Sequence, residues 1–104
     1  MEVATRARRG PRINLRLPVL MLWGSECEAH LEHTFTITLS WNGCAVYSHN
    51  FFPPRSAVQV KRGTKTIEGR VVYCLKDESN NMVEVGVEFE QDARKFWQLP
   101  VWVD

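Results

Sequence analysis

The sequence predicts an all-β fold, namely a six-stranded antiparallel β-barrel with a flexible, arginine-rich N-terminal arm and a short C-terminal helix. Several short segments alternate apolar and polar residues with the period of a half-buried strand, and turn residues separate these segments. Almost no segment has helical periodicity. Closing the strands into a barrel would remove the exposed edges of an open sheet. At 104 residues, we expect one domain over residues 13–104, preceded by a basic arm over residues 1–12.

The first strand expected after the arm is the apolar run over residues 17–23. This run contains Pro18 and is far shorter than the roughly 20 residues that a membrane-spanning helix needs, so we expect no membrane insertion. The alternation over residues 33–40 predicts the next strand. One of its faces is expected to carry Phe35, Ile37 and Leu39, and the other Thr34, Thr36, Thr38 and Ser40.

A tight hairpin is expected next, because Asn42-Gly43 is a dipeptide that readily adopts positive φ angles. Residues 44–48 form the returning strand. Further strands are expected around Val58 and Val60, over residues 66–75 and over residues 83–89. Turns between them are indicated by Pro53-Pro54, by Arg62-Gly63 and by the polar residues 77–81. The long strand is expected to carry Ile67, Val71, Tyr73 and Leu75 on one side.

A short helix is expected near the C-terminus, where Asp92 can cap it through a side-chain oxygen. Phe96, Trp97 and Leu99 would place their apolar groups on the barrel, as core residues rather than as a platform for nucleic-acid bases. Pro100 would end the helix.

Positive charge is concentrated at the N-terminus although the net charge is only +1. Residues 1–16 contain five arginines and one glutamate, 5 − 1 = +4, and the remaining residues carry 8 − 11 = −3. This distribution indicates an anionic ligand that is bound locally. A general nucleic-acid binder would carry a broader basic face, so we do not expect nucleic acid as a partner.

Two constellations could bind such a ligand. The first is Arg8-Arg9-Gly10-Pro11-Arg12, whose guanidinium forks can bond two phosphate oxygens or the O6 and N7 edge of guanine. Its alternative interpretation is a solvated basic tail. The second runs from Thr38 to Gly43, where Thr38 and Ser40 offer two hydroxyls on one strand face and the glycine permits a close approach. Alone, this segment is more typical of an ordinary hairpin.

In combination, the two constellations resemble the pattern of the PilZ domain family, Arg-x-x-x-Arg followed after one strand by Asp/Asn-x-Ser-x-x-Gly. Arg8 and Arg12 match the first element, and Ser40 and Gly43 match the end of the second. Thr38 stands where the family has Asp or Asn. The resemblance covers nearly the whole chain and continues through Leu17-Pro18-Val19, Gly69-Arg70-Val71-Val72, Val85-Gly86-Val87-Glu88-Phe89 and Phe96-Trp97.

The resemblance implies a non-enzymatic signalling domain that binds the second messenger cyclic di-GMP and changes its contacts with a downstream protein partner. Arg8 and Arg12 would engage guanine and phosphate, with Arg9 as an adjacent candidate, while Ser40 donates to the ligand and Gly43 shapes the turn. The short hydroxyl of Thr38 leaves an alternative open, in which the barrel has lost nucleotide binding and acts as a protein-interaction adaptor. A third possibility is a barrel that binds single-stranded nucleic acid.

Other chemistry has little support in the sequence. Three cysteines without paired spacing predict reduced thiols and a cytoplasmic location. Cys27-x-x-His30-x-x-His33 offers three ligands where a structural zinc site takes four, so we interpret it as a loop leading into a strand and expect no metal. No nucleophile motif or carboxylate cluster indicates catalysis, and we expect neither enzymatic activity nor a cofactor.

Overall fold

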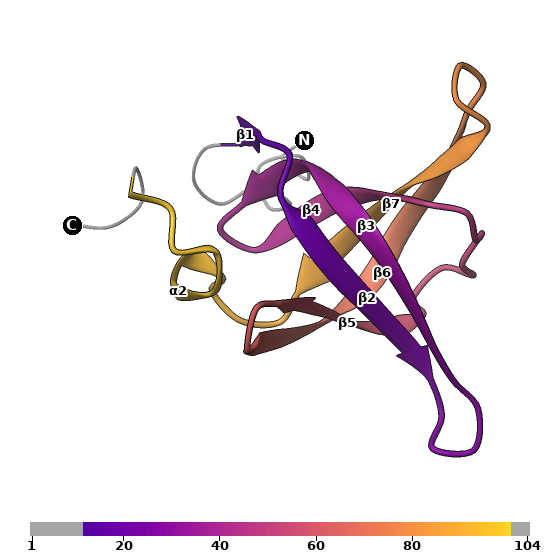
Figure 1. The fold of residues 1–104 in the computed structure, drawn as a ribbon, viewed down its shortest axis with the longest axis horizontal. Coiled ribbons are helices and arrows are strands. Elements are labelled where there is room, and N and C mark those ends of the chain that lie inside the picture. The colour runs from indigo at the N-terminus through magenta and orange to yellow at the C-terminus, as the bar shows by residue number, and fades with distance from the viewer. Residues whose placement is uncertain (1–11, 101–104) are drawn as a thin grey trace, which may run out of the picture.

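The strands of the computed structural model, which describes residues 12–100, close into a six-stranded antiparallel β-barrel (Figure 1). Around the barrel the order is β3-β2-β5-β6-β7-β4, and β4 pairs with β3 to close it. The two-residue strand β1 pairs with the end of β3. The bounds are β1 Ile13–Asn14, β2 Pro18–Gly24, β3 Ala29–Ser40, β4 Gly43–Ser48, β5 Ala57–Arg62, β6 Lys65–Asp77 and β7 Met82–Phe89. The predicted six-stranded antiparallel β-barrel is therefore confirmed, whereas residues 1–11 of the predicted arm lie outside the described residues.

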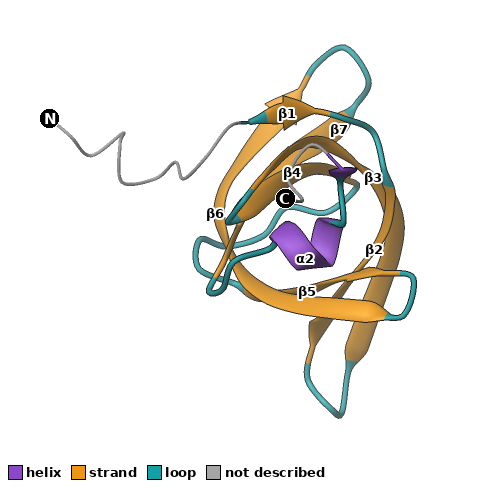
Figure 2. Ribbon diagram, turned by 90° about the vertical axis from the view of Figure 1, so that its left-hand side faces the viewer, coloured by secondary structure: helices purple, strands orange, loops and turns teal. Residues whose placement is uncertain are grey.

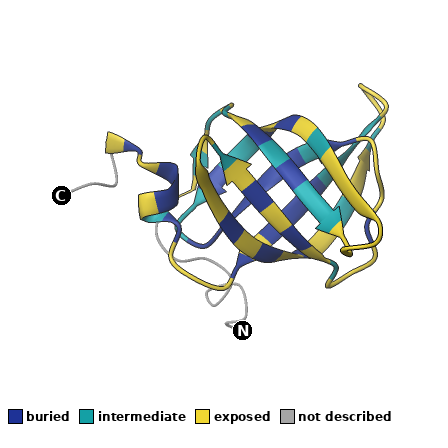
Figure 3. Cartoon of the chain, turned by 60° about the horizontal axis from the view of Figure 1, so that its bottom comes forward, coloured by how far each residue is buried: buried dark blue, intermediate teal, exposed yellow. Residues whose placement is uncertain are grey.

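Buried and exposed residues alternate along the barrel strands (Figure 3), and the buried hydrophobic residues form one core cluster. The predicted alternation along β7 is confirmed, because Val85, Val87 and Phe89 are buried while Glu88 is exposed. Each such side chain contributes about 1.5–3 kcal/mol when it is buried. Among residues 12–100, eight core residues are 0% exposed, namely Met21, Leu39, Val46, Val60, Val71, Val85, Ala93 and Trp97.

A β-bulge in β3 reverses part of the predicted pattern. Thr34 and Thr36 are buried, whereas Phe35 is 40% exposed. The register with β4 shifts between Thr36 and Thr38, and Leu39 is buried beyond the shift. Because side chains alternate with a period of two, one extra residue moves every later side chain to the opposite face. The prediction that Phe35 and Leu39 share a face was therefore wrong.

A second bulge has the same effect in β6, where the register with β7 shifts between Val71 and Tyr73. Ile67 and Val71 are buried as predicted. Tyr73 and Leu75 lie beyond the shift and are 37% and 58% exposed, so their predicted place on the same side was wrong. Val72, at the bulge, is also exposed.

The hairpin between β3 and β4 forms where it was predicted, but for another reason. Trp41 and Asn42 make the turn between the paired residues Ser40 and Gly43, and neither Asn42 nor Gly43 has a positive φ. The predicted role of Gly43 in supplying such an angle was wrong. A Cβ at Gly43 would lie only 2.6 Å from the carbonyl oxygen of Val87 in β7. Glycine is needed here because two strands approach each other closely.

One buried threonine joins β1 to β2. The two strands lie along the same edge of β3, separated by residues 15–17. Thr36 Oγ1 donates to the carbonyl of Leu15 (2.6 Å) and accepts from the N–H of Leu17 (2.9 Å). Its side chain therefore satisfies backbone groups that the break would otherwise leave unpaired, and it fixes the segment that carries Arg12.

Thr36→Val is expected to lower the free energy of unfolding by about 1–2 kcal/mol, because it keeps the shape of the side chain but leaves two backbone groups without a partner. Urea denaturation measures the loss. Thr66→Val, on the exposed start of β6, is the matched control and should change stability by at most about 0.5 kcal/mol. Equal stabilities of the two variants would show that the Thr36 hydroxyl contributes nothing.

A short helix, α2 (Arg94–Trp97), covers one end of the barrel (Figure 2). Asp92 Oδ1 accepts from the backbone N–H of Arg94 (2.8 Å), as predicted for a cap, although Ala93 is the residue at the N-cap position. Phe96, Trp97 and Leu99 are buried, which confirms that they are core residues. No helix within residues 12–100 is long and apolar enough to span a membrane.

Candidate functional site

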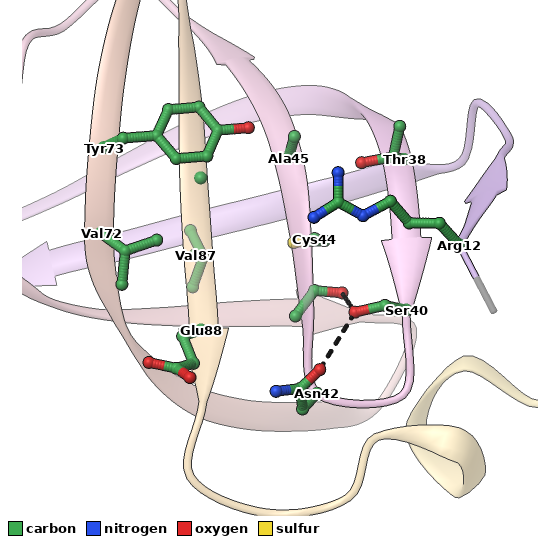
Figure 4. A pocket seen from close by; sticks show the side chains of 12 residues that line it. Arg12, Thr38, Ser40, Asn42, Cys44, Ala45, Val72, Tyr73, Val87 and Glu88 are labelled. Carbon is green, nitrogen blue, oxygen red and sulfur yellow. Dashed lines mark hydrogen bonds between the residues drawn. The ribbon is translucent and has the colours of Figure 1, made fainter. Parts of the chain in front are cut away.

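A pocket of about 330 Å³ lies on the outer face of the barrel, with β4 and β7 as its floor (Figure 4). Few side-chain atoms project from this floor, because three small residues lie next to one another there. Ala45 pairs with Gly86, and Gly43 pairs with Glu88 two positions along the strands, on the same face. Larger residues project on either side of this floor and form two walls.

One wall comes from β3 and from the segment just before β1, and it contains Thr38, Ser40 and Arg12. The register of β1 with β3 pairs Ile13 with Leu39 and Asn14 with Thr38. Extending this register by one residue sets Arg12 opposite Ser40, and Figure 4 shows both on the same side of the pocket. The bulge in β3 is what turns Thr38 and Ser40 outward.

Ser40 and Asn42 form the polar corner of this wall. Ser40 Oγ lies 3.3 Å from Asn42 Oδ1 and 3.3 Å from the carbonyl oxygen of Gly43. Both are long for a hydroxyl donor, whose bonds are usually near 2.7–2.8 Å, so the hydroxyl can turn to a better acceptor. Asn42 was interpreted only as a turn residue, and its place in the pocket was missed.

The opposite wall contains Val72, Tyr73 and Glu88 (Figure 4). The ring of Tyr73 lies across Gly86, since a Cβ there would overlap ring atom Cε2. Its hydroxyl donates to Glu84 Oε2 (2.8 Å). Burial, followed by the hydrogen bond to Glu84, raises the pKa of Tyr73 to about 12, so the phenol is protonated at neutral pH.

The structure brings four of the predicted site residues together: Arg12, Thr38, Ser40 and Gly43 line one pocket. Arg8 and Arg9 lie outside the described residues. Asn42, Tyr73 and Glu88 also line the pocket and were not predicted as site residues from the sequence. Gly86 was the available signal, because a glycine inside an otherwise regular strand indicates that another group approaches its backbone closely.

The pocket contains one positive and one negative side chain, and its described residues do not form a cluster of metal ligands. Arg12 supplies a cation and Glu88 an exposed carboxylate. Burial raises the pKa of the Cys44 thiol to about 12, so this lining residue is neutral and a poor nucleophile. No group of three or more His, Cys, Asp or Glu side chains that could hold a metal ion occurs within residues 12–100.

The predicted loop around Cys27-x-x-His30-x-x-His33 is partly strand, because β3 already begins at Ala29. Cys27 is exposed in the preceding turn. His30 stacks on the ring of Trp23, with 5.6 Å between the ring centroids. These residues lie away from the pocket.

Comparisons with known proteins show the fold. No family model matches the sequence, and no curated protein matches it. Among solved structures, the Bacillus subtilis inhibitor of motility, MotI/DgrA, is similar with a TM-score of 0.65 and 19% sequence identity over 88% of this chain. The chain spans 46% of that structure's length. The likeness identifies the barrel as PilZ-like.

Proposed function

We propose that this domain is a non-enzymatic, cytoplasmic receptor for cyclic di-GMP, and that the bound dinucleotide changes the contacts of the domain with a protein partner. The observation that carries the proposal is the meeting of Arg12, Ser40 and Gly43 in one outer pocket. Arg12 is far from Ser40 and Gly43 in the sequence, and the PilZ pattern singles out all three. The solved neighbour is described as an inhibitor of motility, which is consistent with a regulatory role.

The chemistry of the pocket suits one nucleotide unit of such a ligand. Arg12 can donate two parallel hydrogen bonds to a phosphate, and Ser40 can add a third from the same side. The flat face of Tyr73 on the opposite wall can contact a planar base. The cavity volume of about 330 Å³ lies in the range of small-molecule sites. Arg8 and Arg9 would contribute further guanidinium groups from the arm.

Calorimetric titration with cyclic di-GMP tests the proposal on the wild type, Arg8→Ala and Arg12→Ala. Each substitution removes charge-assisted hydrogen bonds and is expected to weaken binding about 10- to 100-fold. Lys61→Ala is a matched control, because it removes a positive charge from the exposed side of β5, outside the pocket. Its dissociation constant should equal that of the wild type.

The same titration separates the proposal from its rivals. Equal heats for the wild type and both arginine variants would contradict it. The adaptor alternative is favoured by the short side chain of Thr38, and it predicts neither heat nor a thermal shift with any cyclic dinucleotide. A nucleic-acid barrel would instead bind a random single strand, with an affinity that falls steeply as salt is added.

A further inference from the structure

A carboxylate lines this pocket even though the proposed ligand carries two negative charges. Glu88 is exposed, and its side chain has no hydrogen-bond or ion-pair partner among residues 12–100. A carboxylate accepts hydrogen bonds and cannot donate them, so at neutral pH it repels phosphate oxygens. Its presence on the wall opposite Arg12 and Ser40 therefore favours a ligand that also has a hydrogen-bond-donating part.

The strand register places the side chain of Glu88 at the pocket, next to a glycine on the neighbouring strand. Arg70, Glu88, Gly43 and Ser40 form one cross-strand row over β6, β7, β4 and β3. Since Gly43 has no side chain, the residue that pairs with both Glu88 and Ser40 places no side chain between them, and Asn42 lies beside Ser40 at the edge of the pocket. Figure 4 shows these two residues on opposite sides of the pocket.

The nearest cation in this row is engaged elsewhere. Arg70 Nε lies 3.7 Å from Glu90 Oε2, and Arg70 Nη1 donates to the carbonyl of Arg55 (3.3 Å). Arg70 therefore interacts with Glu90 and with the carbonyl of Arg55, and not with Glu88. The pocket has a positive wall at Arg12 and a negative wall at Glu88, which is an arrangement for a ligand with an anionic part and a hydrogen-bond-donating part.

Guanine supplies such a donating part. Its N1–H and N2–H₂ groups point in the same direction and match the two oxygens of one carboxylate. Adenine presents the acceptor N1 on the corresponding edge and has no amino group at C2, so a carboxylate there would meet a lone pair. A site built around hydrogen bonds to a ligand group discriminates strongly against an analogue that lacks it.

We propose that Glu88 is the specificity-determining residue of this pocket, where its carboxylate accepts from N1–H and N2–H₂ of guanine while Arg12 binds phosphate on the opposite wall. The inference rests on the proposed function. It assigns base recognition to β7, whereas the sequence pattern alone places recognition on the arm and on the hairpin from Thr38 to Gly43.

The test compares the wild type with Glu88→Gln by calorimetric titration against cyclic di-GMP, cyclic di-IMP and cyclic di-AMP. Cyclic di-IMP keeps N1–H but lacks the N2 amino group. The wild type should bind cyclic di-GMP most tightly, cyclic di-IMP more weakly and cyclic di-AMP most weakly. Glu88→Gln should weaken cyclic di-GMP binding about 10- to 100-fold and reduce the preference for guanine over adenine.

Glu90→Gln is the matched control, because it removes the same charge just beyond the end of β7, outside the pocket. Its affinities should equal those of the wild type. The exposed position of Glu88 predicts an unchanged melting temperature for Glu88→Gln, so a weaker titration reports recognition rather than unfolding.

The outcomes distinguish this inference from the function on which it rests. If Glu88→Gln binds cyclic di-GMP as tightly as the wild type or more tightly, Glu88 does not recognise guanine, while the receptor function stands. If the wild type binds cyclic di-GMP and cyclic di-AMP equally, the inference is also overturned. Binding of no cyclic dinucleotide by the wild type overturns both.

Discussion

Trp97→Ala is expected to lower the free energy of unfolding by about 3–5 kcal/mol. Trp97 is 0% exposed and is the largest of the fully buried side chains. Its ring packs against two other aromatic rings, with centroid distances of 4.8 Å to Phe96 and 6.0 Å to Phe89. Truncation would leave a cavity at the covered end of the barrel, and the surrounding strands could fill it only partly. Urea denaturation followed by circular dichroism measures the loss.

Two further variants test this explanation. Lys95→Ala removes an exposed side chain from the same helix and should change stability by at most about 0.5 kcal/mol. Trp97→Phe keeps most of the packing but loses the hydrogen bond from Nε1 to the carbonyl of Ser40 (3.2 Å), so it should fall between the wild type and Trp97→Ala. A change below about 1 kcal/mol for Trp97→Ala would show that α2 is not part of the core.

The effect of Trp97→Ala should extend to the pocket, because the C-terminal segment holds the hairpin that carries Ser40. Besides the bond from Trp97, the N–H of Ala93 donates to the carbonyl of Trp41 (2.6 Å) and the N–H of Phe89 donates to the carbonyl of Asn42 (2.8 Å). These bonds hold the backbone of the turn against β7 and against the segment that leads into α2. Loosening α2 is therefore expected to weaken ligand binding as well as stability.

The positions of the strands could be predicted from the sequence, because alternating apolar and polar residues identify a strand that has one buried face. The alternation over β7, the glycine turn at Gly63 (φ 64°) and the positive φ of Asn81 (59°) follow from local preferences. The bulges in β3 and β6 could not be predicted. Each bulge adds one residue to a strand whose sequence still alternates regularly. Only the pairing with the neighbouring strand shows where the side chains change from one face to the other.

The same limit explains which site residues were missed. Ser40 and Gly43 belong to a local pattern and could be found through the resemblance to the PilZ family. Tyr73 faces the pocket because of the bulge in β6, and Glu88 because its strand pairs with Gly43. Cross-strand neighbours of this kind depend on register, which a single sequence does not specify.

Gly43→Ala is expected to lower the free energy of unfolding by about 3 kcal/mol, at the upper end of the range for overpacked sites. The added Cβ would lie 2.6 Å from the carbonyl oxygen of Val87, which is backbone and cannot turn away as a side chain could. β4 and β7 would have to separate at this point. Urea denaturation measures the stability, and titration with cyclic di-GMP measures the pocket.

The same substitution should also weaken binding about tenfold or more, because the separation of β4 from β7 moves Ser40 and Glu88 apart and disrupts at least one hydrogen bond to the ligand. Gly63→Asn is the control: no atom lies within 4 Å of a Cβ at that turn, and asparagine tolerates its φ of 64°. If Gly43→Ala matched this control in stability, the close approach of β4 and β7 would not be what requires glycine. Lost binding at unchanged stability would instead place Gly43 in direct contact with the ligand, since a Cβ would then act on the ligand and not on the strand pair.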